Sequence, residues 1–349
     1  MLFGLNKILE EKISNANLRA FCIGYDLGVC RIEPFAEILL DGLVDFAFGY
    51  HTGILKKYDR RLLIEAAKSI YKINNYEKAK KIYLDDNNVI SSDEEGKTEE
   101  EIKYEKEILR KGEFGELLLH IILHDYYQTV PLISKIFFKD SDGFAVHGFD
   151  SIHIGKDPED PQKDSLFLGE SKIYYRSDGK SGEHGVKDLA TDIQEHFNAD
   201  FLRREFALVS KKRDSFKSIE DYDDENTKKE YEEFLIKKNS WIDELHQISE
   251  RKQKLQDILG SVTIPVICTY QSKIFEKHRD DSSPDFANDF NSEINALEQK
   301  FREEIKNIAA APGQPVRTDL NIVLIMLPIP SKKELVLMLH QKTWRQSNA

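Results

Sequence analysis

Hydrophobic positions recur with two different periods along the chain, one typical of strands and one typical of helices. Runs rich in Val, Ile, Leu and aromatic residues predict strands at 21–26, 143–154, 165–175, 261–270 and 320–330. Apolar residues at helical spacing predict helices at 31–50, 59–83, 103–127, 186–206, 285–309 and 331–346. Because strands and helices alternate, the predicted fold class is α/β, with a mixed sheet flanked by helices.

Changes in composition divide the chain into four segments. Residues 1–102 form an N-terminal α/β segment with a basic helix and an acidic linker, and 103–210 form a core. Residues 85–107 carry ten acids against three lysines, which is typical of a linker that runs into a helix. A charged helical insertion spans 211–256, and 257–349 supply strands and helices that complete the sheet.

Bulk properties limit the function classes that are open to this chain. No run of residues approaches the roughly 20 apolar positions that cross a bilayer, so we expect no membrane contact. Three cysteines without paired spacing favour reduced thiols and a cytoplasmic location. A net charge of -12 repels nucleic acid at long range, so handling DNA would need a local basic patch, a metal or a partner.

The strand sequence LFLGESKIYY (166–175) contains two charges among apolar residues that should be buried. Residues two apart on a strand share a face, so Glu170 and Lys172 point to the same side. The same alternation places Asp150 on the matching face of the preceding strand. If these faces meet the helix at 103–127, Glu116 joins them, and three carboxylates converge with one ammonium group.

Three converging carboxylates would repel one another and raise their pKa values unless a cation lay among them. A hard divalent ion, Mg²⁺ or Mn²⁺, suits carboxylate oxygen and leaves water ligands free for a phosphate substrate. The alternative is a buried salt bridge between Lys172 and one of the acids. Such a pair would leave two carboxylates without an explanation.

The order of these residues resembles the PD-(D/E)xK nuclease core, although Phe149 stands where that motif has proline. The resemblance implies three metal-binding carboxylates, Glu116, Asp150 and Glu170, with Lys172 assisting the attacking water. It also suggests that Gln194, on the following helix, is the glutamine that some branches of that family place beside the lysine.

The phrases FGELLLHIIL, HGFDSIHI and LGESKIYY resemble the HamA family, the nuclease subunits of Hachiman anti-phage defence systems. The resemblance implies a metal-dependent deoxyribonuclease, an endonuclease or nickase, in a heterodimer with a superfamily 2 helicase of the HamB kind. It implies that this helicase restrains the nuclease until aberrant DNA is met.

Two further points stay open at the level of sequence. The glycine-rich stretch RSDGKSGEHG (176–185) is either a loop in which Arg176 or Lys180 contacts a DNA phosphate, or an uninvolved surface loop. The protein could instead be an inactive nuclease-fold subunit that binds a helicase, or a nuclease that acts on RNA or without a helicase.

Overall fold

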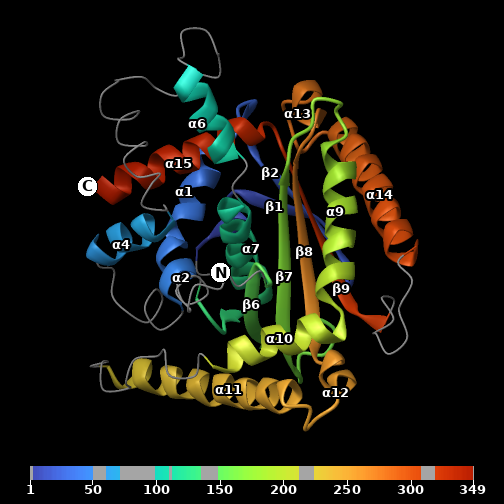
Figure 1. Cartoon of the computed structure of the whole chain (residues 1–349). Coiled ribbons are helices and arrows are strands. Elements are labelled where there is room, and N and C mark those ends of the chain that lie inside the picture. Colours follow the sequence, from blue (N-terminus) through green and yellow to red (C-terminus); the bar gives the residue numbers. More distant parts are fainter. Residues whose placement is uncertain are drawn as a thin grey trace.

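The computed structural model describes residues 3–49, 60–70, 99–109, 112–134, 148–211, 224–307 and 319–348. Seven strands form one sheet in the order β1-β2-β9-β8-β7-β6-β5 (Figure 1). The bounds of these strands are β1 Leu9–Asn15, β2 Leu18–Ile23, β5 Val130–Pro131, β6 Ser151–Lys156, β7 Asp164–Tyr174, β8 Val262–Gln271 and β9 Asn321–Ile329. A separate small hairpin pairs β3 (Tyr25–Asp26) with β4 (Val29–Cys30).

The sheet is mixed, as the sequence predicts. Strands β2, β9, β8 and β7 run parallel to one another, while β1 pairs antiparallel with β2, β6 pairs antiparallel with β7, and β5 adds a short antiparallel edge. Strands β7, β8 and β9 are buried along most of their length, which explains their almost continuous apolar sequences.

Helices cover both faces of the sheet and bury two apolar layers (Figure 1). One layer contains α9 Ser181–His196, α10 Ala199–Ser210, α11 Glu225–Ser249, α12 Leu255–Leu259, α13 Ile274–Lys277 and α14 Pro284–Asn307. The other contains η1 Leu5–Lys7, α1 Ile32–Asp41, α2 Leu43–Phe48, α7 Glu113–Tyr127 and α15 Lys332–Asn348. Helices α4 (Arg60–Ile70) and α6 (Glu99–Leu109) pack against α15.

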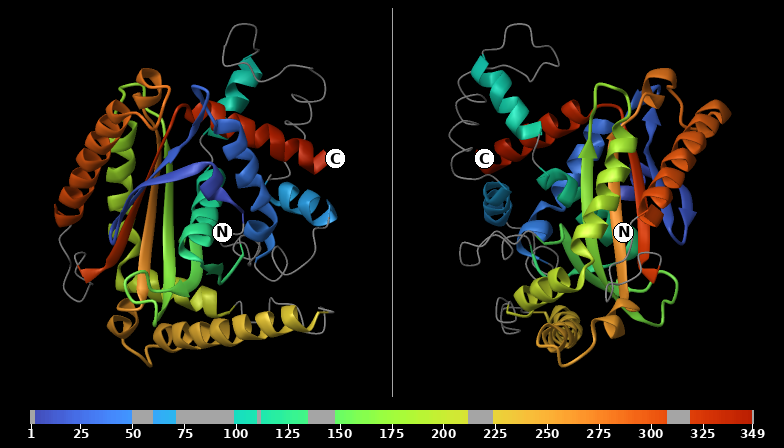
Figure 2. Two further views of the ribbon diagram at one scale, coloured as in Figure 1. Left: turned by 180° about the vertical axis from the view of Figure 1, so that it is seen from behind. Right: turned by 45° about the vertical axis from the view of Figure 1, so that its right-hand side comes forward.

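The N-terminal strands complete the sheet that the C-terminal strands build. Strand β2 pairs in parallel with β9, so two segments about 300 residues apart in sequence lie side by side, as the rear view in Figure 2 shows. Strand β1 carries charged residues on its exposed positions, and the sequence pattern alone did not predict it. The sheet therefore draws strands from 1–102, 103–210 and 257–349.

Several element boundaries differ from those expected from the pattern. The expected helix at 103–127 is two helices, α6 and α7, and the expected helix at 186–206 is α9 followed by α10. Of the strand expected at 143–154, only Ser151–Lys156 is observed, since 135–147 lie outside the described residues. The same holds for parts of the basic helix near 59–83, of which α4 is described.

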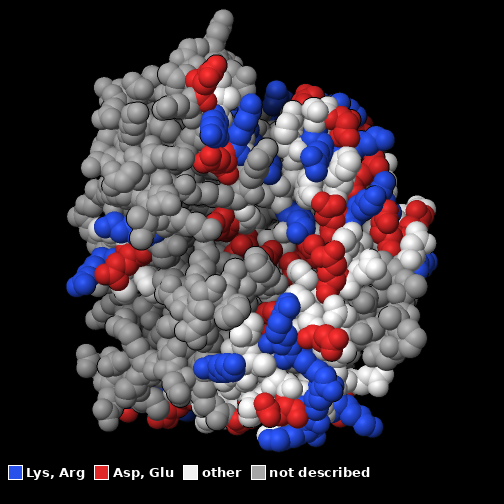
Figure 3. Space-filling view, in the orientation of Figure 1, with Lys and Arg blue, Asp and Glu red and all other residues white. Residues whose placement is uncertain are grey.

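The charged insertion is not solvated on every side. Helix α11 buries Tyr231, Trp241 and Leu245 against the core, because its apolar residues recur on one face. Lys and Arg gather over α10 and the turn between α11 and α12, at the lower end of the view in Figure 3. In the described part of the chain, no helix is long and apolar enough to cross a membrane.

Candidate active site

Strand β7 is longer than its neighbour β6, and this difference leaves part of its edge open. Strand β6 pairs with β7 only from Asp164 to Gly169, whereas β7 pairs with β8 as far as Tyr174. Beyond Gly169, the backbone of β7 therefore has no strand partner on the β6 side among the described residues. Glu170 and Lys172 lie on this half-open stretch.

Asp150 caps the open edge just where β6 begins. The backbone N–H and the hydroxyl of Ser171 donate hydrogen bonds to Oδ2 of Asp150, at 2.9 and 2.7 Å. The backbone N–H of Asp150 donates to the carbonyl of Gly169 at 3.0 Å. These three bonds satisfy backbone groups that a continuing strand would otherwise pair, and they fix the carboxylate beside the buried charges.

Glu170 is buried, with 3% of its surface exposed, and it contacts one base. Its Oε1 lies 2.6 Å from Nδ1 of His196, at the end of α9. Burial raises the pKa of Glu170 to about 8, and the charges of Asp150 and Asp192 raise it further while His196 opposes the shift. Burial lowers the pKa of His196, but the Glu170 carboxylate outweighs it, so the net shift is upward.

Lys172 is paired with Asp192, an acid outside the predicted set of carboxylates. Its Nζ lies 2.6 Å from Oδ2 of Asp192, on α9. Burial alone would lower the pKa of Lys172, but the hydrogen bond and charge of Asp192, with Glu170 and Asp150, raise it. The salt-bridge alternative is thus present, with Asp192 as the partner, and it leaves Asp150 and Glu170 together.

The two contacts from α9 match the geometry of the strand opposite. Asp192 and His196 are four residues apart on a helix, a rise of about 6 Å. Glu170 and Lys172 are two apart on a strand, a rise of about 6.6 Å. Each helix side chain therefore meets one strand side chain, and this i, i+4 pair on the next helix is the signal by which both could have been found.

Glycines let α9 approach the sheet this closely. A Cβ at Gly185 would clash with Sγ of Cys268 on β8, and one at Gly182 would lie 2.6 Å from Cδ1 of Leu297 on α14. The glycine-rich sequence therefore serves helix packing from Ser181 onward, and only 175–180 form the connection after β7.

The expected meeting of the Glu170 face with the helix at 103–127 is wrong. That face packs against α9, whereas α7 covers the opposite face of the sheet. Helix α7 still reaches the open edge, because a Cβ at Gly115 would lie 3.2 Å from Oγ of Ser171. Glu116, next in sequence and half-buried, therefore comes from the far side of the edge that Asp150 caps.

Gln194 is not brought to Lys172. It is exposed and follows Asp192 by two residues, a rotation of about 200° around α9, so it leaves the helix on the other side. Asp192 occupies the place beside the lysine that was expected for Gln194. Lys180 is exposed at the start of α9 and is not among the residues that line the cleft described next.

A cleft of about 560 Å³ opens along the edge of β7. It is lined by 171–176 with Asp150, and by Lys106, Leu109, Gly112, Lys332 and Lys333. In Figure 1 the surrounding elements are the upper part of β7, α6 and the start of α15. Five of the lining side chains are cationic, Lys106, Lys172, Arg176, Lys332 and Lys333, and one is an acid, Asp150. An acidic protein thus has a local basic cleft.

Two of these cations crowd each other. Burial, followed by the charge of Arg176, lowers the pKa of Lys332. Nζ of Lys332 donates to the carbonyl of Ile173 at 2.8 Å, which caps a second group on the open edge. A bound anion would relieve the repulsion between the ammonium and the guanidinium groups.

The predicted set of three metal ligands does not form as a set. Within the described ranges, no three His, Cys, Asp or Glu side chains could jointly hold a metal ion. Protein sites for Mg²⁺ usually supply only one or two carboxylates, with water completing the shell. Asp150 and Glu170 satisfy this smaller requirement. Burial, and after it the charge of Asp150, raises the pKa of Glu170, and a cation between the two carboxylates would offset both effects.

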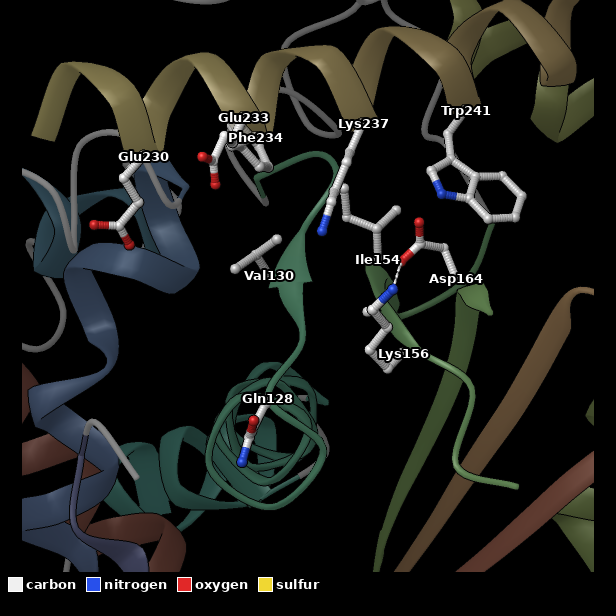
Figure 4. Close-up of a pocket in the computed structure, with 11 residues that line it drawn as sticks. Gln128, Val130, Ile154, Lys156, Asp164, Glu230, Glu233, Phe234, Lys237 and Trp241 are labelled. Carbon is white, nitrogen blue, oxygen red and sulfur yellow. Dashed lines mark ion pairs between the residues drawn. The ribbon is translucent and has the colours of Figure 1, made fainter. Parts of the chain in front are cut away.

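A second cavity, of about 210 Å³, lies between α11 and the β5–β6 edge. Figure 4 shows Phe234 and Trp241 reaching from α11 toward Val130 and Ile154, while Lys156 is paired with Asp164 at 2.9 Å. Its charged side chains are spread along the rim and no buried carboxylates converge there, so we do not place catalysis at this cavity.

No curated protein matches the chain. The family model HamA matches residues 3–343, which is nearly the whole length. This membership points to a role in Hachiman anti-phage defence, in association with a partner of that system. The chain belongs to the HamA family.

Proposed function

We propose that this protein is a Mg²⁺-dependent DNA nuclease, held in a heterodimer with an ATP-driven superfamily 2 helicase that restrains and activates it. The observation that carries the proposal is the basic cleft that leads along β7 to Asp150 and Lys172. Glu170 is buried close enough to Asp150 for the charge of Asp150 to add to the rise in its pKa, which burial causes in the main. A cleft of this kind favours a phosphodiester next to a divalent cation.

The side chains divide the work between them. Asp150 and Glu170 would hold the ion, and a divalent ion bound there would supply Lewis-acid chemistry, polarising the phosphate and lowering the pKa of a water molecule. Lys172 offsets the charge that develops on the phosphate or orients the attacking water. Asp192 positions Lys172, and His196 positions Glu170. Glu116, at the start of α7, lies on the other side of the edge and is not part of this pair of ligands.

The helicase partnership is supported by the family and by the charge of the chain. A net charge of -12 gives no long-range attraction to DNA, and the basic cleft acts only at short range. A partner that delivers DNA to the cleft would supply what the chain lacks.

The direct test is DNA cleavage by the purified chain, alone and with its helicase and ATP. Supercoiled plasmid and linear DNA would be incubated with Mg²⁺, with Mn²⁺ and with EDTA. We expect nicked or fragmented DNA that requires the metal and increases when the helicase is active. If no condition yields cleavage while the helicase still binds the chain, the protein is an inactive nuclease-fold module.

Replacing Asp192 by asparagine should slow cleavage by about 10- to 100-fold while the KM for DNA changes little. Asparagine keeps the size of the side chain but removes the charge that holds Lys172. Single-turnover rates at saturating DNA would measure the effect. Glu195→Gln, an exposed change of the same charge on the same helix, is the control. An Asp192→Asn enzyme with wild-type rates would show that Asp192 does not position the lysine.

Replacing Arg176 by alanine should weaken DNA binding by about threefold to tenfold and reduce its salt dependence by roughly one phosphate contact. The guanidinium group lines the cleft and has no carboxylate partner described. Affinity would be measured by fluorescence anisotropy in EDTA at several salt concentrations. Lys187→Ala, an exposed change on α9, is the control. If the dependence of the affinity on salt concentration is unchanged, Arg176 does not contact a DNA phosphate.

A further inference from the structure

The size of the basic cleft limits the form in which DNA can enter it. A volume of about 560 Å³ is in the range of sites for single small molecules. A duplex presents a major groove about 12 Å wide flanked by two backbones, and it cannot enter such a space as a whole. A single strand can place one or two nucleotides there.

The wall of the cleft carries an exposed aromatic ring among its cations. Tyr175 is 54% exposed and lines the cleft directly before Arg176. It is one of only four large hydrophobic side chains exposed in the described ranges. More than half of its surface is thus open to solvent, and burying that part of the ring against a ligand would be favourable.

The neighbours of Tyr175 are fixed in place. The hydroxyl of Tyr174 donates to Asp188 on α9, and the guanidinium carbon of Arg176 lies 5.5 Å from the centre of the Tyr174 ring. Tyr174, the last residue of β7, is thus occupied on the α9 side, and Tyr175 follows it directly. The backbone at Ile173 is held by Lys332. Tyr175 is therefore an exposed ring on a rigid support.

An aromatic ring beside crowded cations is the combination that binds single strands. Bases stack on such rings irrespective of sequence, because every base has a π-face. The phosphate next to the stacked base would lie between Arg176 and Lys332, and it would relieve the repulsion between these two cations.

We propose that the cleft takes a single DNA strand, with a base stacked on Tyr175 and a neighbouring phosphate held by Arg176 and Lys332. This inference rests on the proposed nuclease function and names the form of its substrate. The scissile phosphate then reaches Asp150 and Lys172 only where the duplex has been opened, which is the product of helicase activity.

The test compares the affinity of the full-length chain for single- and double-stranded DNA in EDTA. The protein would be titrated into a fluorescein-labelled oligonucleotide of 15 nucleotides, and into the blunt-ended duplex of the same sequence, while the fluorescence anisotropy is recorded. We expect the single strand to bind at least tenfold more tightly. Tyr175→Ala should weaken its binding about tenfold and Tyr175→Phe should not, and an oligonucleotide with abasic sites should bind both wild type and Tyr175→Ala weakly.

Leu27→Ala is the matched control, because Leu27 is 99% exposed and is not among the residues that line the cleft. Equal or tighter binding of the duplex, or wild-type affinity of Tyr175→Ala for the single strand, would overturn the inference. Cleavage with duplex preference would leave the nuclease proposal standing without it. If single strands bind in a Tyr175-dependent way but no metal-dependent cleavage occurs, the inference about the strand stands and the proposed nuclease activity is rejected.

Discussion

Replacing Lys172 by methionine should reduce DNA cleavage by at least about 100-fold, while DNA binding changes only a few-fold. Methionine keeps the length of the side chain but removes the ammonium group that lies between Asp192 and the cleft. Because that charge is needed most as negative charge develops on the phosphate, the loss should appear in the rate of cleavage. Single-turnover cleavage and anisotropy in EDTA would measure the two quantities separately.

The variant must be distinguished from a misfolded protein, because it leaves the partly buried Asp192 without its cation. The double variant Lys172→Met with Asp192→Asn removes both charges and should recover the thermal stability that the single variant loses. It should remain inactive. Lys187→Met, an exposed change on α9, should cleave normally. A stable double variant with near wild-type cleavage would show that Lys172 has only a structural role.

Replacing Glu170 by glutamine should abolish metal-dependent cleavage and yet stabilise the metal-free protein above about pH 8. Glutamine can still accept a hydrogen bond near His196, but it carries no charge in a buried position. The pKa of Glu170 is raised from 4.5 to about 8, chiefly by burial. Each unit of such a shift corresponds to about 1.4 kcal/mol, so the stabilisation should amount to a few kcal/mol.

The sign of the pH dependence follows from proton linkage. The folded state binds the Glu170 proton more tightly than the unfolded chain does, so wild-type stability falls as the pH rises from about 4.5 to about 8. The advantage of Glu170→Gln should therefore be largest above pH 8 and should shrink toward pH 5. Thermal denaturation in EDTA at pH 5, 7 and 9 would measure it. Glu195→Gln, an exposed change, should show no pH-dependent gain in stability. If Glu170→Gln is less stable than the wild type at pH 9, the raised pKa of Glu170 is contradicted.

Much of the sheet could be predicted because several of its strands have a distinct sequence pattern. Strands β7, β8 and β9 are buried on both faces and read as apolar runs. Strand β1 is an edge strand whose exposed positions are polar or charged, so its sequence resembles that of a loop, and its place in the sheet depends on pairing with β2. Strands β2 and β9 are far apart in the sequence, so their pairing is a tertiary contact that local sequence patterns cannot predict.

The candidate site was predicted from alternation along two strands, and its supporting helix was not. Parity correctly put Glu170 and Lys172 on one side of β7, but it could not tell which helix covers that side. Helix α9 does so because Gly182 and Gly185 permit its close approach, and their effect depends on Leu297 and Cys268 far along the chain. Alternation along the strands therefore could not identify Asp192 or fix the direction of His196, and the resemblance pointed to Gln194, which leaves α9 on another side.

The measurement that tests the central claim most directly is the location of Mn²⁺ by anomalous scattering in a crystal of this protein. The account predicts one strong peak in contact with carboxylate oxygens of both Asp150 and Glu170, and its absence from Glu170→Gln crystals. A crystal saturated with Mn²⁺ that shows no peak at these carboxylates would contradict the assignment of a metal-dependent centre to this edge of the sheet.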